Sequence, residues 1–147
     1  MGRQATVLVI DDEEAIRCLI RRSLEPSYEV RESPDGPDGL KQARWVKPDL
    51  ILLDLRMPGL DGLTVLAKLK ADRRTATIPV VIVSGRGETD LLIEVQRMGA
   101  VDHVIKPFNV EDLREVIQRQ LALRGGTLPA GDQEGERGRD EQRIIEQ

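Results

Sequence analysis

Apolar residues along the chain fall into short runs separated by stretches with helical spacing. Three runs rich in Val, Ile and Leu predict buried strands, and two shorter stretches are further strand candidates. In chain order these five segments are residues 5–10, 28–32, 50–53, 79–83 and 102–105. The first, third, fourth and fifth of them run directly into Asp11, Asp54, Ser84 and Lys106. The ends of the predicted strands are therefore where polar chemistry is concentrated.

The stretches that follow these strands predict helices. Residues 13–24 have apolar positions at helical spacing with arginines between them, as in an amphipathic helix, and Pro26 ends the pattern. Further helices are expected over residues 39–46, 62–71 and 88–98, with Gly99 at a C-cap position, and Asn109 predicts the N-cap of a fifth helix. The expected inward positions of the first and fifth helices are Ile16, Leu19, Ile20 and Leu24, and Leu113, Val116, Ile117 and Leu121.

Strand and helix therefore alternate five times. This order predicts an α/β fold, with a parallel sheet covered by helices on both faces and right-handed crossovers. Apolar residues make up 39% of the 147 and aromatic residues only 2%, so the core must consist of Val, Ile, Leu and Ala. Trp45 is expected to pack at a helix end. We predict one domain over residues 1–124, followed by a flexible charged linker or tail over residues 125–147, which could lead to a further domain.

Charge and cysteine content narrow the classes of function. The net charge is −4, and residues 125–147 carry −3 of it, from three Arg and six Asp or Glu. A nearly neutral body without a basic stripe argues against direct nucleic-acid binding by the domain. The apolar runs are too short to span a membrane, and no stretch resembles a signal peptide. With a single cysteine, Cys18, these features favour a cytoplasmic location.

Ligands of open α/β sheets bind beyond the carboxyl ends of the strands. There the first strand is followed by Asp11 and Asp12, the third by Asp54, the fourth by Ser84, and the fifth by Lys106. We expect these five side chains to converge at one edge of the sheet.

This set of residues suits the transfer of a phosphoryl group. Three neighbouring carboxylates repel one another, and a Mg²⁺ ion would remove that conflict with the backbone carbonyl of Arg56 as a further ligand. Lys106 would neutralise phosphoryl oxygens and the Ser84 hydroxyl would donate a hydrogen bond to them. Asp54 lies between the other acids and the lysine, so it is the best candidate for a nucleophile that forms an aspartyl phosphate.

In order and spacing, these motifs resemble the receiver domain of two-component response regulators. They are Asp11-Asp12, Asp54 with Met57-Pro58-Gly59-x-Asp61-Gly62, Ser84-Gly85, Gly99-Ala100 and Lys106-Pro107-Phe108. The resemblance covers about the first 124 residues and implies a flavodoxin-like fold with strand order 2-1-3-4-5. It also implies Mg²⁺-dependent transfer from a sensor histidine kinase or phosphotransfer protein to Asp54, with Asp11 and Asp12 as metal ligands, Ser84 as the switch hydroxyl and Lys106 as the phosphate-pairing lysine.

One position departs from the family pattern. Three residues before the lysine the family usually has Tyr or Phe as a rotating switch residue, whereas this chain has His103. His103 is either a switch residue or a partly exposed polar side chain on an edge strand. Arg56 and Arg86, two residues after Asp54 and Ser84, either shape the access of water to the phosphoryl group or are solvated charges.

Two other functions compete with a signalling switch that catalyses only its own phosphorylation and slow dephosphorylation. A phosphatase acting on small substrates through an aspartyl phosphate usually needs a second acid two residues after the nucleophile, and Arg56 occupies that position. A phosphorylation-independent interaction module would have lost some of the five site residues, and all are present. Relatives often form dimers through the fourth and fifth helices, but the sequence leaves the choice between monomer and homodimer open.

Overall fold

The computed structural model describes residues 3–125, and a sheet of five parallel strands forms its centre. The strands lie in the order 2-1-3-4-5, so β2 and β5 form the edges. Both the predicted α/β class and the flavodoxin-like strand order are confirmed. The strands are β1 (Thr6–Ile10), β2 (Glu29–Ser33), β3 (Leu50–Asp54), β4 (Val80–Ser84) and β5 (Asp102–Ile105).

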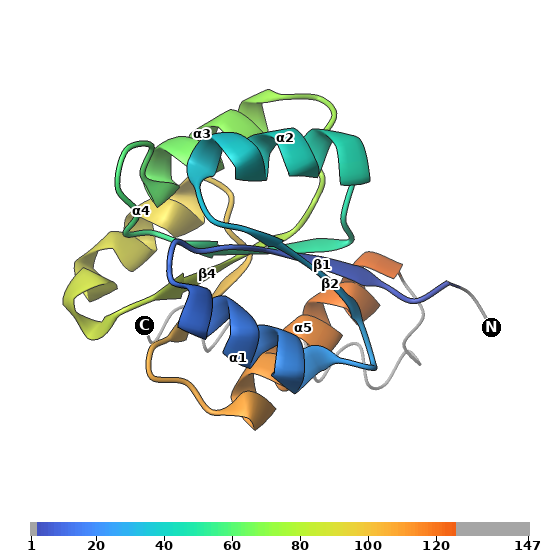
Figure 1. Cartoon of the computed structure of the whole chain (residues 1–147). Helices are drawn as coiled ribbons and strands as arrows, with labels where there is room; N and C mark the ends of the chain where they lie inside the picture. The colour runs from blue at the N-terminus through green and yellow to red at the C-terminus, as the bar shows by residue number, and fades with distance from the viewer. Residues whose placement is uncertain (1–2, 126–147) are drawn as a thin grey trace.

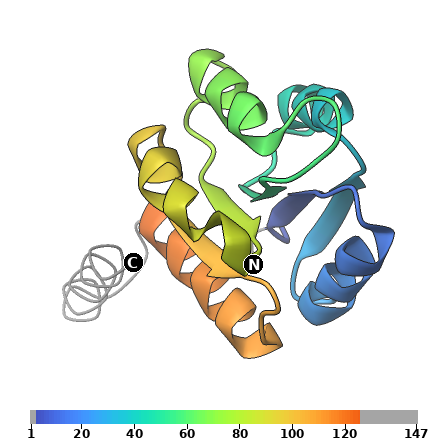
Figure 2. The same cartoon turned by 90° about the vertical axis from the view of Figure 1, so that its left-hand side faces the viewer.

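Helices cover both faces of the sheet. Figure 1 shows α2 and α3 above the sheet and α1 and α5 below it, and Figure 2 views the same layers toward the carboxyl ends of the strands. A 3-10 helix, η1 (Arg86–Leu91), leads into α4, on the same face as α2 and α3. The helices are α1 (Glu14–Leu24), α2 (Gly36–Val46), α3 (Gly62–Ala71), α4 (Leu92–Arg97) and α5 (Val110–Gly125).

Each face of the sheet has its own apolar core. Leu8 and Ile10 of β1 pack toward α2, α3 and α4, whereas Val7 and Val9 pack toward α1 and α5. Because β1, β3 and β4 are buried on both faces, their sequences are almost continuously apolar. The core is built from Val, Ile, Leu and Ala with Met57, close to the expectation from composition.

Most segment predictions are confirmed to within one to three residues, and three details were wrong. The helix expected over residues 88–98 is divided into η1 and the short α4, because Gly87, Thr89 and Asp90 have low helix propensity. Leu19 is 44% exposed, since Ile20 and Leu24 form the stripe of α1 that is buried against the sheet. Trp45 is 80% exposed, because α2 buries its opposite face.

The register of the strands aligns their polar ends. Ile10 pairs with Leu53, so the following residues, Asp11 and Asp54, lie level on neighbouring strands. Ser84 pairs with Ile105, which brings Lys106 level with Gly85. Within residues 3–125, no helix combines the length and apolar character needed to cross a lipid bilayer.

Close packing at the start of α3 also fixes the end of β3. A Cβ atom added to Gly62 would lie 2.3 Å from the carbonyl oxygen of Asp54 and 2.5 Å from Cα of Leu55. Because these are backbone atoms, they cannot move aside without displacing the end of β3. Gly62 is therefore required where α3 begins.

We predict that Gly62→Ala lowers the free energy of unfolding by about 1–3 kcal/mol, as expected for overpacking. Urea denaturation followed by circular dichroism measures this change. Gly87→Ala is the matched control, because a Cβ at Gly87 meets no atom within 4 Å in the described structure. Equal stability of the two variants would contradict the prediction.

Candidate functional site

The three predicted acidic residues meet at the carboxyl ends of β1 and β3. One carboxylate oxygen from each of Asp11, Asp12 and Asp54 lies within 4.8 Å of the others. Asp11 and Asp54 are only 1% and 4% exposed, whereas Asp12 is exposed to solvent. A hollow of about 570 Å³ lies over this acidic cluster, and Asp12, Asp54, Arg56 and Lys106 are among its lining residues.

Lys106, which follows β5, provides the positive charge of the cluster. Its Nζ donates to Asp11 Oδ2 at 3.1 Å and lies 3.5 Å from Asp54 Oδ1. The exposed Glu13 carboxylate is a further neighbour, with Oε1 3.6 Å from Nζ. A single ammonium group is thus shared among three carboxylates.

The carboxyl groups are electrostatically frustrated. Burial, together with the charge of Asp11, raises the pKa of Asp54 to about 7. The charge of Lys106 and the hydrogen bond from the backbone N–H of Arg56 lower this pKa but do not cancel the rise. Burial also raises the pKa of Asp11, partly offset by the Glu13 N–H and Lys106. Burial alone would lower the pKa of Lys106, but Asp11 and Asp54 raise it, so the ammonium group stays charged. The cluster therefore holds fewer positive charges than its carboxylates require.

The acidic cluster fits a hard divalent cation. Carboxylate oxygens from three residues are the ligands that Mg²⁺ prefers, and the exposed position of Asp12 leaves one side open to water. The positive charge of a bound cation would counteract the raised pKa of Asp54, because it would offset both the burial of the carboxylate and the charge of Asp11. The Arg56 N–H donates to Asp54 Oδ1 at 3.4 Å, so this residue adjoins the acids; its carbonyl as a ligand stays a prediction.

Ser84 lies at the end of β4 as predicted. Its residue is fully buried, and its Oγ is the one buried side-chain oxygen or nitrogen without a hydrogen-bond partner in the described part of the chain. The Ser84 carbonyl accepts a hydrogen bond from the Lys106 N–H at 2.7 Å, which joins the ends of β4 and β5. An unsatisfied buried hydroxyl is energetically costly, and Ser84 therefore retains an unused donor at the end of β4.

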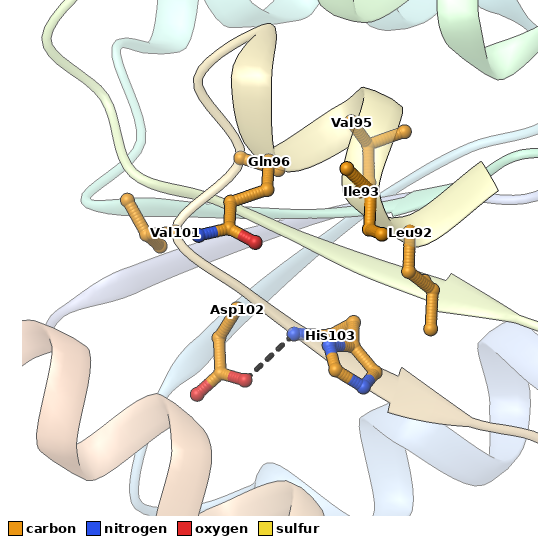
Figure 3. Close-up of a pocket in the computed structure, with 8 residues that line it drawn as sticks. Leu92, Ile93, Val95, Gln96, Val101, Asp102 and His103 are labelled. Atoms are coloured by element: carbon orange, nitrogen blue, oxygen red, sulfur yellow. Dashed lines mark hydrogen bonds between the residues drawn. The ribbon is translucent and has the colours of Figure 1, made fainter. Parts of the chain in front are cut away.

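His103 lies apart from the acidic cluster. It lines a groove between β5 and α4, where Figure 3 shows Leu92 of α4 extending toward it. The backbone N–H of His103 donates a hydrogen bond to Asp102 Oδ1 at 2.8 Å. β5 is an edge strand as expected, but His103 is only 9% exposed, so it is more buried than a partly exposed polar residue.

Two residues that contribute to the hollow were not predicted. Glu13 approaches Lys106, and Glu88 of η1 binds both the Gly85 N–H and Arg56. Glu88 is the third residue after Gly85, the spacing at which a glutamate side chain returns to the N-cap backbone, so this bond had a sequence signal. The contact with Arg56 joins residues 32 apart and had none.

Comparison with known proteins agrees with this geometry. Residues 7–118 match the family described as the response regulator receiver domain, so the chain belongs to this family. It is 40% identical over 124 residues to the DNA-binding dual master transcriptional regulator RpaA of Synechocystis sp., a match that covers 84% of this chain and 51% of RpaA. The chain thus matches about half the length of that relative.

Two other similar proteins are nearer in size to the domain. Sporulation initiation phosphotransferase F of Bacillus subtilis is 31% identical over 119 residues, covering 80% of this chain and 94% of the relative. The crystal structure of a response regulator receiver domain protein from Clostridium thermocellum matches with a TM-score of 0.78 and 29% identity, covering 84% and 99% of the two chains. The prediction of a phospho-accepting receiver domain is confirmed, and the phosphorylation-independent alternative is not favoured.

The raised pKa of Asp54 predicts a specific pH dependence of stability. Its value of about 7 in the folded protein exceeds the ordinary 3.8, so the folded state binds the proton more tightly than the unfolded state. Stability from this group therefore falls as pH rises from about 4 to about 7. Asp54→Asn removes this loss and should raise Tm at pH 8 in EDTA by about 5 °C or more.

Thermal unfolding of both proteins at pH 4.5 and pH 8 measures the effect. The difference in Tm should be small at pH 4.5, and added Mg²⁺ should reduce it at pH 8. A difference in Tm that does not depend on pH would show that Asp54 is not charge-frustrated in the folded protein.

Proposed function

We propose that Asp54 is the residue that accepts the phosphoryl group in this receiver domain. The observation that supports this assignment is the position of Asp54: its buried carboxylate lines the hollow, beside the other two acids and 3.5 Å from the Lys106 ammonium. Asp11 is more deeply placed and does not line the hollow, and Asp12 is solvent-exposed. Among the three acids, Asp54 is the buried one that is reached from the hollow and also lies beside the Lys106 ammonium.

The proposed donor is a phosphohistidine of a sensor histidine kinase or a phosphotransfer protein. A carboxylate oxygen of Asp54 forms a bond to phosphorus while the phosphorus–nitrogen bond breaks, and the electron pair leaves with the imidazole nitrogen. The name of sporulation initiation phosphotransferase F supports this type of transfer. We infer that the chain catalyses only this reaction and the slow hydrolysis of its product, as a cytoplasmic signalling switch.

The remaining site residues have separate proposed roles. Mg²⁺, held by Asp11, Asp12, Asp54 and the Arg56 carbonyl, would supply positive charge for the transferred oxygens. Lys106 would pair with a phosphoryl oxygen on the β5 side. The unpartnered hydroxyl of Ser84 would donate to another oxygen and so move toward Asp54.

The proposed output lies outside this domain. RpaA is named as a DNA-binding regulator and is about twice as long as the matched region, so a DNA-binding output domain joined to a receiver is one arrangement among relatives. Of the predicted linker over residues 125–147, only Gly125 is described, as the last residue of α5, and the rest lies outside the described residues. We propose that this segment connects the receiver domain over residues 1–124 to an output domain, and that phosphorylation changes the surface that this output or a second receiver contacts.

A phosphatase acting on small molecules is the less favoured function. In such an enzyme a general acid would stand near Asp54 at position 56, where Arg56 occurs. The Arg56 guanidinium is bound to Glu88 and cannot donate a proton at neutral pH. Turnover of a small phosphate ester would be required to support this function.

We predict that Asp54→Asn abolishes phosphorylation by acetyl phosphate in the presence of Mg²⁺, because an amide cannot act as the nucleophile. Intact-mass spectrometry detects the phosphoryl adduct directly. Asp90→Asn, an exposed acid on η1, is the control and should be phosphorylated like the wild type. Full phosphate incorporation into the Asp54→Asn protein would refute the assignment.

We also propose that His103 is a switch residue, because it lies three residues before Lys106 and its side chain lines the groove beside α4. Beryllofluoride with Mg²⁺ mimics the phosphoryl group on a carboxylate. We predict that this complex changes the NMR resonances of the His103 ring in the wild type and leaves them unchanged in Asp54→Asn. Identical ring resonances with and without the complex in the wild type would show that His103 is not coupled to the site.

A further inference from the structure

The carboxylate of Glu88 is buried and bound on both oxygens. Its side chain is only 8% exposed. Glu88 Oε1 accepts a hydrogen bond from the Gly85 N–H at 2.7 Å, and Oε2 accepts one from Arg56 Nε at 3.0 Å. Glu88 therefore connects the loop after β3, which contains Arg56, to the turn after β4, which contains Gly85.

These two donors belong to the wall of the hollow above Asp54. Arg56, Gly85 and Glu88 all line it together with Asp54 and Lys106. The Arg56 side chain is 80% exposed, so apart from its bond to Glu88 it is free to turn within the hollow. The Gly85 N–H directly follows Ser84, whose Oγ is buried without a partner. In the unphosphorylated protein, Glu88 thus holds donors that face the same hollow as Asp54.

A phosphoryl group on Asp54 would change the balance of charge at this point. It adds about −1.5 to −2 charges and three strong hydrogen-bond acceptors to the hollow. The buried Glu88 carboxylate would then lie near a second anion, and like charges repel each other. The phosphoryl oxygens and the Glu88 carboxylate would compete for the Arg56 guanidinium and the backbone N–H of Gly85.

We propose that Glu88 is a positioning residue that competes with the phosphoryl group for the Gly85 N–H and the Arg56 guanidinium. This inference rests on the proposed function of Asp54. In the unphosphorylated state Glu88 fixes η1 against the site. In the phosphorylated state the donors turn to the phosphoryl oxygens, Glu88 is released, and η1 with the attached α4 can move.

Thermodynamic linkage predicts the direction in which the affinity for a phosphoryl mimic changes when Glu88 is replaced. If phosphorylation must break the contacts of Glu88, then these contacts oppose the phosphorylated state. Weakening them should therefore strengthen the binding of a phosphoryl mimic. A residue with only a structural role would weaken binding, or leave it unchanged, when replaced.

The test is a beryllofluoride titration of Glu88→Gln at constant Mg²⁺. Glutamine keeps the size of the side chain and an oxygen that accepts from Gly85, but it removes the charge. We expect the beryllofluoride concentration for half saturation to fall about tenfold, equivalent to about 1.4 kcal/mol, in the range of one hydrogen bond to a charged group. Asp90→Asn removes an exposed charge from the same 3-10 helix and should bind like the wild type.

Equal or weaker binding by a folded Glu88→Gln protein would overturn the inference. If the wild type itself fails to bind beryllofluoride, the proposed function of Asp54 fails instead, so the two failures are distinguishable. Hydrogen exchange of wild-type residues 86–91 provides a measurement that needs no variant. Exchange there should accelerate on saturation with beryllofluoride, and unchanged or slower exchange would also overturn the release of Glu88.

Discussion

The central constraint on this structure is the concentration of negative charge at the ends of two neighbouring strands. Asp11 and Asp54 are held level by the register of β1 and β3, and both are almost completely buried. The two carboxylates cannot move away from each other, because the residues that precede them are anchored in apolar cores on both sides of the sheet. The repulsion is therefore offset by groups brought to it, and Lys106 provides only part of the required charge. Such an imbalance favours the binding of a cation or a further positive side chain at this cluster.

The same imbalance connects the site to the rest of the domain. Each group that can compensate a charge at Asp54 comes from the end of a different strand: Lys106 after β5, Gly85 after β4 and Arg56 after β3. Under the proposed function, a change in charge at Asp54 would therefore affect the partners of three separate segments. Two of these segments are already joined through Glu88, so the response of the site to an added phosphoryl group includes the start of η1.

Sequence patterns predicted the sheet and the acidic cluster because both depend on local signals. Strands buried on two faces are nearly continuous apolar runs, and each run stops abruptly at a polar residue such as Asp11 or Asp54. The division of the fourth helix follows from the low helix propensity of Gly87, Thr89 and Asp90, which apolar periodicity does not register. The exposure of Trp45 depends instead on tertiary packing. The contact between Arg56 and Glu88 joins two loops, and only the relative position of β3 and β4 brings them together. The backbone carbonyl of Arg56 and the role of His103 depend on bound states, so they remain predictions.

The groove beside His103 is connected to the acidic cluster along two elements. β5 carries His103 in its middle and runs into Lys106, and the Lys106 N–H is bonded to the carbonyl of Ser84. On the other wall of the groove, α4 is the direct continuation of η1, whose Glu88 binds the donors beside Asp54. Both walls thus begin at groups that face the added charge. Because β5 is paired to β4 on one edge only, and α4 is a single short helix, these walls are less constrained than the central strands. The groove is thus formed by an edge strand and a short helix, and the proposed function would place both next to a change in charge at Asp54.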